Sequence, residues 1–203
     1  MKTGIFGGTF DPPHLGHALV AEQALRQLNL DRILFMPASN PWMKDRERIT
    51  EVDNRVEMTV LATEGNDKFV VSRMEADRAG PTYTADTLRE LREQGEEEIY
   101  LIVGLDTLAE ISLWHTPKYI VEMATIVGYP RDGFEKIPAR QLDAVKEGAS
   151  REVVLLTGPT VSISSTRVRA YVSKGHSVEG LVPAAVNEYI SEKGLYGGTD
   201  ARS

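Results

Sequence analysis

The chain has 203 residues, and its 23 Lys and Arg against 30 Asp and Glu give a formal net charge of −7, which disfavours DNA or RNA as a partner. It contains no cysteine, which excludes disulfide scaffolds, thiolate metal sites and a cysteine nucleophile. No apolar run approaches the roughly 18–20 residues of a membrane-spanning helix. We therefore expect a cytoplasmic enzyme or binding protein that uses neither a membrane nor a nucleic acid.

Short apolar runs alternate along the chain with segments of helical period. In chain order, the predicted elements are strand Thr3–Phe6, helix Gly16–Leu30, strand Arg32–Met36, helix Glu51–Glu64, strand Lys68–Ser72, helix Thr84–Gln94, strand Glu98–Val103, helix Thr116–Ala124, strand Thr125–Gly128, helix Pro138–Glu147, strand Glu152–Leu156, helix Ser165–Lys174 and helix Pro183–Lys193. Thr84 is predicted to cap its helix, which Gly95 closes.

This order predicts an α/β fold, a Rossmann-like doubly wound parallel sheet with helices on both faces. Several strands are continuously apolar, as strands covered on both faces are. We expect a single domain over residues 1–196 and a flexible tail over residues 197–203. Ligands of such sheets bind outside the carboxyl ends of the strands, so those ends are where a site is expected.

The first strand runs directly into a glycine-rich motif, Gly-Gly-Thr-Phe-Asp-Pro-Pro-His-Leu-Gly-His over residues 7–17. Gly7 and Gly8 let a ligand approach the backbone, and the helix that follows points its free N–H groups at the same place, which favours phosphate. His14 and His17, three residues apart, can face one side. The alternatives are a turn with two surface histidines and a metal pair. Since nothing nearby supplies further metal ligands, we predict no metal site in the protein.

A second motif follows the last predicted strand, where Ser164, Ser165 and Thr166 begin a helix and Arg169 lies one turn further along. The hydroxyl and N–H groups at this helix start, together with the guanidinium, can hold an anion. A capped helix with solvated arginines is the alternative interpretation. The polar segment 37–50, which carries Lys44, is the longest polar connection before a helix and is predicted to be a functional loop.

Together, these motifs resemble the nucleotidylyltransferase superfamily, as His14-x-x-His17 and Ser164-x-Thr166-x-x-Arg169. The closer resemblance is to the bacterial nicotinate-nucleotide adenylyltransferases, and it covers about residues 1–196. It continues through Pro81–Leu88, Gly104-x-Asp106, Trp114, Arg131, Leu181–Pro183 and Leu195-Tyr196. Two places depart from the family pattern: the second loop keeps Lys44 without the family's histidine, and the segment around Arg131 differs from the common Arg-Pro-Gly.

The resemblance implies transfer of the adenylyl group of ATP to nicotinate mononucleotide, which gives deamido-NAD and pyrophosphate in NAD biosynthesis. Mg²⁺ is expected to arrive with ATP. The implied catalytic residues are His14, His17, Lys44 and Arg169. The implied ATP-binding residues are Gly7, Gly8, Thr9, Phe10, Gly104, Asp106, Ser164, Ser165 and Thr166. The implied mononucleotide-binding residues are Tyr83, Thr84, Asp106, Trp114 and Arg131.

Other interpretations stay open at this point. The acceptor can be nicotinamide mononucleotide or pantetheine phosphate, although enzymes of the latter family usually carry Thr at the position of His14. The chain can also be a nucleotide sensor without catalysis, or a tRNA-synthetase-like module, for which its length leaves little room. Trp114 is a core aromatic in the alternative reading, and His115 and His176 are expected on the surface. A homo-oligomer is compatible with the sequence.

Overall fold

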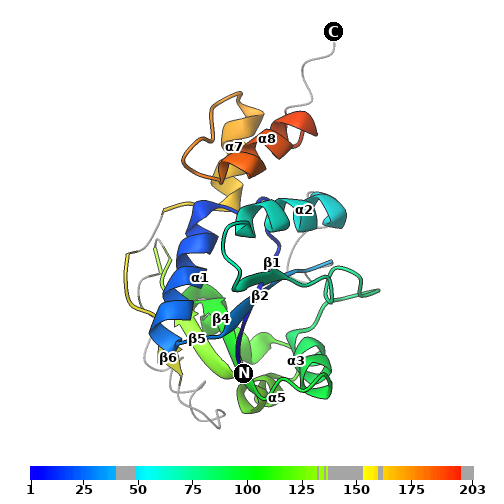
Figure 1. Cartoon of the computed structure of the whole chain (residues 1–203), viewed down its shortest axis with the longest axis vertical. Helices are drawn as coiled ribbons and strands as arrows, with labels where there is room; N and C mark the ends of the chain where they lie inside the picture. Colours follow the sequence, from blue (N-terminus) through cyan, green and yellow to red (C-terminus); the bar gives the residue numbers. More distant parts are fainter. Residues whose placement is uncertain (40–48, 132, 135, 137–152, 160–161, 198–203) are drawn as a thin grey trace.

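The computed structural model describes residues 1–39, 49–131, 133–134, 136, 153–159 and 162–197, and Figure 1 shows their arrangement. Within these residues, the strands form one parallel sheet of order β3-β2-β1-β4-β5-β6. The strands are β1 Lys2–Gly8, β2 Arg32–Pro37, β3 Phe69–Val71, β4 Glu98–Gly104, β5 Thr125–Tyr129 and β6 Val154–Leu155. The helices are α1 Leu15–Leu28, α2 Val52–Thr63, α3 Thr84–Glu93, α4 Leu105–Ala109, α5 Pro117–Met123, α7 Ser165–Ser173 and α8 Ala184–Glu192, with a 3₁₀ helix η2 at Ile111–Leu113.

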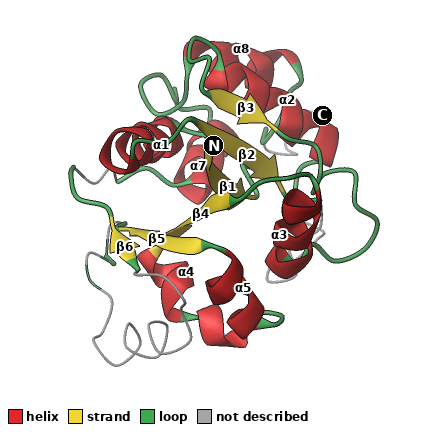
Figure 2. Cartoon of the chain, turned by 60° about the horizontal axis from the view of Figure 1, so that its bottom comes forward, coloured by secondary structure: helices red, strands yellow, loops and turns green. Residues whose placement is uncertain are grey.

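Apolar side chains alternate between the two faces of the sheet, because successive strand residues point in opposite directions. Ile5 packs in the cluster that contains α3, α4 and α5, whereas the adjacent Phe6 packs in the cluster that contains α1. Figure 2 shows the sheet between these two layers of helices. The predicted Rossmann-like doubly wound sheet is therefore confirmed.

The topology places a crevice between β1 and β4. From β1 the chain proceeds to β2 and β3 on one side, then crosses back to β4 on the other side of β1. The two strands are parallel neighbours, with Lys2 opposite Glu98 and Ile5 opposite Leu101. Their carboxyl ends, Gly8 and Gly104, lie at the same edge of the sheet, where connections diverge in opposite directions and leave room for a ligand.

The last two helices, α7 and α8, pack against α2 rather than against the sheet, and Figure 1 shows them beside it at one end of the molecule. Their contact is a third apolar cluster, in which Met58 of α2 meets Val168 of α7 and Val186 and Ile190 of α8. This packing brings the amino end of α7 back to the loop that follows β1.

Some local features differ from the sequence expectations. The helices α4 and η2 were not predicted, since at five and three residues they are too short for a periodic signal. Tyr83, rather than Thr84, is the N-cap of α3. The predicted helix Pro138–Glu147 and most of the predicted loop 37–50 lie outside the described residues. None of the described helices is long and apolar enough to cross a membrane.

Candidate active site

A cavity of about 1030 Å³ opens at the carboxyl ends of β1 and β4. Its walls come from the loop after β1, the start of α3, the segment after β4 and the start of α7. Every residue predicted for the site lines this cavity except Lys44, which lies outside the described residues: Gly7, Gly8, Thr9, Phe10, His14, His17, Tyr83, Thr84, Gly104, Asp106, Trp114, Arg131, Ser164, Ser165, Thr166 and Arg169.

Bare backbone forms the wall at the end of β1. A Cβ built on Gly7 would meet nothing within 4 Å, so this position faces open space. A Cβ on Gly8 would lie 3.0 Å from the ring of Phe10, which is buried and adopts a positive φ of 47°. The Phe10 ring in turn packs edge-on against the His17 ring, with 5.0 Å between their centroids. The two glycines thus expose peptide groups to a ligand while the ring of Phe10 supports His17.

The two histidines form a stacked pair at the amino end of α1. Their ring centroids are 3.6 Å apart, and the backbone N–H of His14 donates to Nδ1 of His17 at 3.0 Å. Because Nδ1 of His17 accepts a hydrogen bond, the ring proton of His17 lies on Nε2. Burial, aided by the positive charge of Arg131, lowers the pKa of His14 to about 4, so His14 is neutral at physiological pH.

The start of α7 is joined to the loop after β1. Ser164 caps α7 by accepting a hydrogen bond from the backbone N–H of Arg167 at 3.2 Å, as predicted. Ser165 Oγ donates to the carbonyl of Pro12 at 2.9 Å, and Arg169 Nη1 donates to the carbonyl of Asp11 at 2.7 Å. The two sequence motifs, about 150 residues apart, therefore form one wall of the cavity.

A buried arginine that the sequence analysis missed ties the loop after β1 to both ends of the connection between β2 and α2. Arg55, only 1% exposed, donates to the carbonyls of Thr9 and Thr50 at 2.8 Å and of Ser39 at 3.3 Å. Burial lowers its pKa, while the nearby charge of Asp11 opposes that effect. Arg55 lies inside a helix of ordinary pattern, so no local signal distinguishes it from a solvated arginine.

Asp11 links the same loop to the end of the chain. Its Oδ1 accepts a hydrogen bond from the phenol of Tyr196 at 2.6 Å, and its Oδ2 accepts one from the backbone N–H of Thr50 at 3.3 Å. Burial together with the charge of Asp11 raises the pKa of Tyr196, so the phenol remains a donor. The final residues before the tail therefore support the loop that carries the first motif.

The start of α3 lies at another part of the cavity. Its N-cap, Tyr83, makes no side-chain cap hydrogen bond, so the first amides of the helix, at Thr84 and Ala85, lack intrahelical partners. The Tyr83 ring stacks on His115 at 4.5 Å between centroids. His115 is exposed, as expected, and it also lines the cavity, a role that the sequence did not indicate. Trp114 both lines the cavity and packs against the core.

A charged pair joins the segment after β4 to the segment after β5. Arg131 Nη1 donates to Asp106 Oδ2 at 3.3 Å, and Arg131 Nη2 donates to the phenol of Tyr129 at 2.6 Å. A Cβ at Gly104 would displace the Asp106 carboxylate from its present position and would lie 3.1 Å from Arg131 Nε. The glycine therefore allows Asp106 and Arg131 to meet beside the end of β4.

The described residues contain no group of three or more His, Asp or Glu side chains placed to hold a metal ion. In the described part of the chain, the cations that line the cavity are the guanidinium groups of Arg131, Arg167 and Arg169, and the amino ends of α1 and α7 add N–H groups. Such a cavity suits phosphate-bearing ligands, because hydrogen-bond donors and guanidinium groups line it together.

Comparison with known protein families places the chain in a family. A family model described as cytidylyltransferase-like matches residues 5–171. This match covers most of the chain and identifies it as a protein of the cytidylyltransferase-like class, with which its parallel sheet is compatible.

Closer relatives narrow the class. A Dehalococcoides mccartyi protein named "probable nicotinate-nucleotide adenylyltransferase" is 41% identical over 198 residues, covering 97% of each chain. A Saccharopolyspora erythraea protein of the same name is 41% identical over 200 residues, covering 98% of this chain and 91% of that one. The chain belongs to the nicotinate-nucleotide adenylyltransferase family.

The fold is also shared with solved structures. The Plasmodium falciparum nicotinic acid mononucleotide adenylyltransferase complexed with NaAD has a TM-score of 0.78 at 20% identity, covering 97% of this chain and 98% of that one. A structure from Vibrio parahaemolyticus of a protein described as a nicotinate-nucleotide adenylyltransferase has a TM-score of 0.69 at 20% identity, covering 97% and 96%. At this identity the likeness concerns the fold.

Proposed function

We infer that this protein transfers the adenylyl group of ATP to nicotinate mononucleotide, releasing pyrophosphate and forming deamido-NAD in NAD biosynthesis. The observation that carries this conclusion is the contact between the two motifs, where Arg169 meets the Asp11 carbonyl at 2.7 Å on the wall of one cavity. That cavity, at about 1030 Å³, is large enough for two nucleotides.

The chemistry requires positioning more than acid–base catalysis. A phosphate oxygen of the mononucleotide attacks the α-phosphorus of ATP, and the bond from that phosphorus to the oxygen bridging the β-phosphorus breaks. The attacking group is already an anion, so no general base is needed. The site must instead offset the repulsion between two polyanions and stabilise the charge that develops on pyrophosphate.

The loop after β1 and the start of α7 are suited to the ATP phosphates. His17, with its proton on Nε2, supplies a donor for the α-phosphate, and the stacked His14 supplies a second. Arg169 and the hydroxyls of Ser164 and Thr166 take the β- and γ-phosphates. The backbone at residues 7–9, Phe10 and the segment from Gly104 to Asp106 border the rest of the ATP, and Lys44 supplies a further cation. Mg²⁺ bound to ATP would screen the phosphate charge, and no protein side chain is assigned to hold it.

The start of α3 and the segment after β4 are suited to the mononucleotide. The amide of Thr84, together with the positive end of the helix, receives the nicotinate carboxylate next to Tyr83. Trp114 offers an aromatic surface to the pyridine ring. Asp106 takes ribose hydroxyls, and Arg131, paired with Asp106, faces the mononucleotide phosphate.

A direct assay tests the function. The purified protein, given ATP, Mg²⁺ and nicotinate mononucleotide, is expected to release pyrophosphate, and parallel reactions with nicotinamide mononucleotide and pantetheine phosphate rank the acceptors by kcat/KM. A higher kcat/KM for pantetheine phosphate would reassign the acceptor. If no acceptor leads to pyrophosphate release, the proposed adenylyltransferase activity would be refuted and a nucleotide sensor would be favoured.

The role of His17 has its own test. His17→Ala is expected to lower kcat by roughly 10²-fold or more, because it removes one preorganised donor to the reacting phosphate. His176→Ala is the matched control, since His176 is exposed and packs on Tyr171 away from the cavity. A fully active His17→Ala variant would remove His17 from the mechanism.

A further inference from the structure

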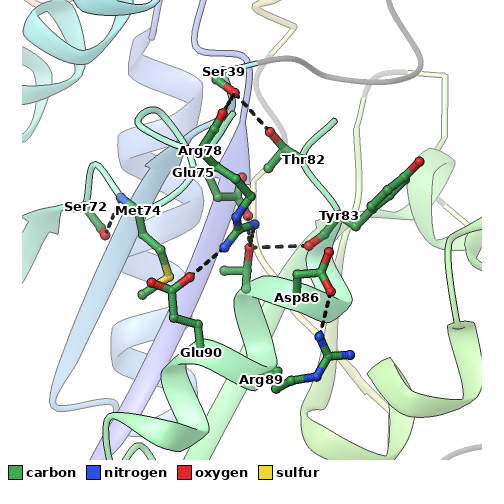
Figure 3. Close-up of polar contacts among 11 residues, drawn as sticks. Ser39, Ser72, Met74, Glu75, Arg78, Thr82, Tyr83, Asp86, Arg89 and Glu90 are labelled. Atoms are coloured by element: carbon green, nitrogen blue, oxygen red, sulfur yellow. Dashed lines mark hydrogen bonds and ion pairs between the residues drawn. The ribbon is translucent and has the colours of Figure 1, made fainter. Parts of the chain in front are cut away.

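A buried polar cluster supports the start of α3, and Figure 3 shows its side chains. Thr87 is at its centre and is only 1% exposed. Its hydroxyl donates to Glu75 Oε1 at 2.7 Å and accepts from Arg78 Nη1 at 2.9 Å. The hydroxyl has only one proton, and this fixes the direction of both hydrogen bonds. Arg78 donates to Thr87, and Thr87 donates to Glu75.

The turn between β3 and α3 is attached on two sides. Arg78 Nη2 pairs with Glu90 of α3 at 2.8 Å. On the other side, Ser39, just after β2, donates from its backbone N–H to the carbonyl of Glu75 at 3.3 Å and from its hydroxyl to the carbonyl of Arg78 at 3.1 Å. The same hydroxyl lies 3.3 Å from Thr82 Oγ1. The backbone that enters α3 is therefore held from both directions.

Two kinds of polar group line this part of the cavity, where the proposed function places the pyridine substituent. The first amides of α3 are donors, so they match a carboxylate and oppose the NH₂ of a carboxamide. Glu75, 7% exposed and part of the cavity lining, is an acceptor with the opposite preference. Its negative charge also opposes a carboxylate on the ligand. Selectivity for the acid requires that the lone pairs and the charge of Glu75 be engaged elsewhere.

We propose that Arg78 and Thr87 are positioning residues that engage the Glu75 carboxylate and thereby give the cavity its preference for a carboxylate over a carboxamide on the pyridine ring. Thr87 occupies Glu75 Oε1, and Arg78 offsets the Glu75 charge through Thr87. The donor amides of α3 are then the groups that meet the substituent. This inference rests on the proposed adenylyl transfer and names the determinant of its acceptor.

Opposing effects act on the ionisation of Glu75, and Thr87 and Arg78 are the groups that favour its carboxylate form. Burial raises the pKa of Glu75, while the hydrogen bond from Thr87 and the charge of Arg78 act against that rise. Removal of the Thr87 hydroxyl leaves a buried carboxyl group without this donor, and the carboxyl is then available to a carboxamide NH₂.

The experiment compares kcat/KM for the acid and amide mononucleotides in three variants. Thr87→Val, which keeps the shape and removes the hydroxyl, is expected to lower the acid-to-amide ratio about tenfold, mainly through KM for nicotinate mononucleotide, with KM for ATP within about twofold. Thr87→Ser keeps the hydroxyl and is expected to retain the wild-type ratio. Thr63→Val is the matched control, because this buried threonine hydroxyl bonds only carbonyls of its own helix α2 in the described structure.

The outcomes separate this inference from the proposed function. An unchanged ratio in Thr87→Val, or an equal rise in KM for ATP, overturns the inference even though the enzyme is active. A wild-type protein that adenylylates neither mononucleotide overturns both. If Thr87→Val does not fold, Glu75→Gln decides, because it still accepts from Thr87 but carries no charge. We expect Glu75→Gln to keep or raise the ratio, and a fall in the ratio would refute the proposal.

Discussion

Neutral His14 makes the folded protein sensitive to mildly acidic pH. His14 is 8% exposed, and burial followed by the positive charge of Arg131 lowers its pKa from 6.5 to about 4. In the unfolded chain the ring regains its ordinary pKa, so between these two values the unfolded state binds more protons than the folded state. Stability linked to His14 is therefore complete above pH 6.5 and decreases as the pH falls toward 4.

The magnitude follows from the shift. The pKa of His14 is lower in the folded than in the unfolded protein by 6.5 − 4, or about 2.5. Each pKa unit corresponds to roughly 1.36 kcal/mol, so the unfolding free energy changes by about 3.4 kcal/mol over the whole titration. Lowering the pH from about 7.5 to about 5.0 expresses about 2 kcal/mol of it, because the unfolded ring is then almost fully protonated while the folded ring is largely neutral.

Urea unfolding of the wild type and of His14→Gln at the two pH values measures this effect. Glutamine is polar and does not titrate. When the pH is lowered, the unfolding free energy of the wild type should therefore fall by about 2 kcal/mol more than that of His14→Gln. His176→Gln, at an exposed position, should show no such shift. A His14→Gln difference that is the same at both pH values would refute the reasoning, as would a His14 imidazole that titrates near pH 6.5 by NMR.

Three further substitutions test the packing around the site. Gly4→Ala should destabilise the protein by about 1–3 kcal/mol in urea, because its Cβ would lie 2.9 Å from the Leu30 side chain; an unchanged midpoint would contradict this. Gly7→Ala, whose Cβ meets nothing within 4 Å, should preserve the midpoint but raise KM for ATP. Tyr196→Phe should cost about 1–3 kcal/mol, since it removes a donor from the Asp11 carboxylate; retention of full stability would show that this hydrogen bond contributes nothing.

Much of the fold was predictable because its signals are local. The continuously apolar strands and the amphipathic helices carry the periods of their elements, and the glycines after β1 mark a tight junction. The end of α3 at Gly95, with its φ of +92°, was predicted for the same reason. The N-cap of α3 was misplaced by one residue, because a helix without a side-chain cap has no residue type that marks its start.

Other features depend on contacts between distant segments. Nothing near Arg55 in the sequence indicates that its guanidinium reaches the carbonyls of Thr9, Ser39 and Thr50. His115 is a surface histidine, as expected, but only the fold shows that it stacks on Tyr83 at the cavity. The pairing of Thr87 with Glu75 likewise joins α3 to a turn that local periodicity does not place. The roles of these three residues depend on contacts between segments that are distant in sequence, and residue spacing along the chain does not predict such contacts.

The sequence by itself determined the class of fold, the two phosphate-type motifs and their order along the chain, because each depends on residues within a few positions of one another. The tertiary structure alone decided that Arg169 contacts the Asp11 carbonyl and that His14 is neutral and stacked on His17. The physical reason is that hydrogen bonds across the cavity and desolvation depend on the packing of α7 and α8 against α2, and long-range packing is a property of the whole chain.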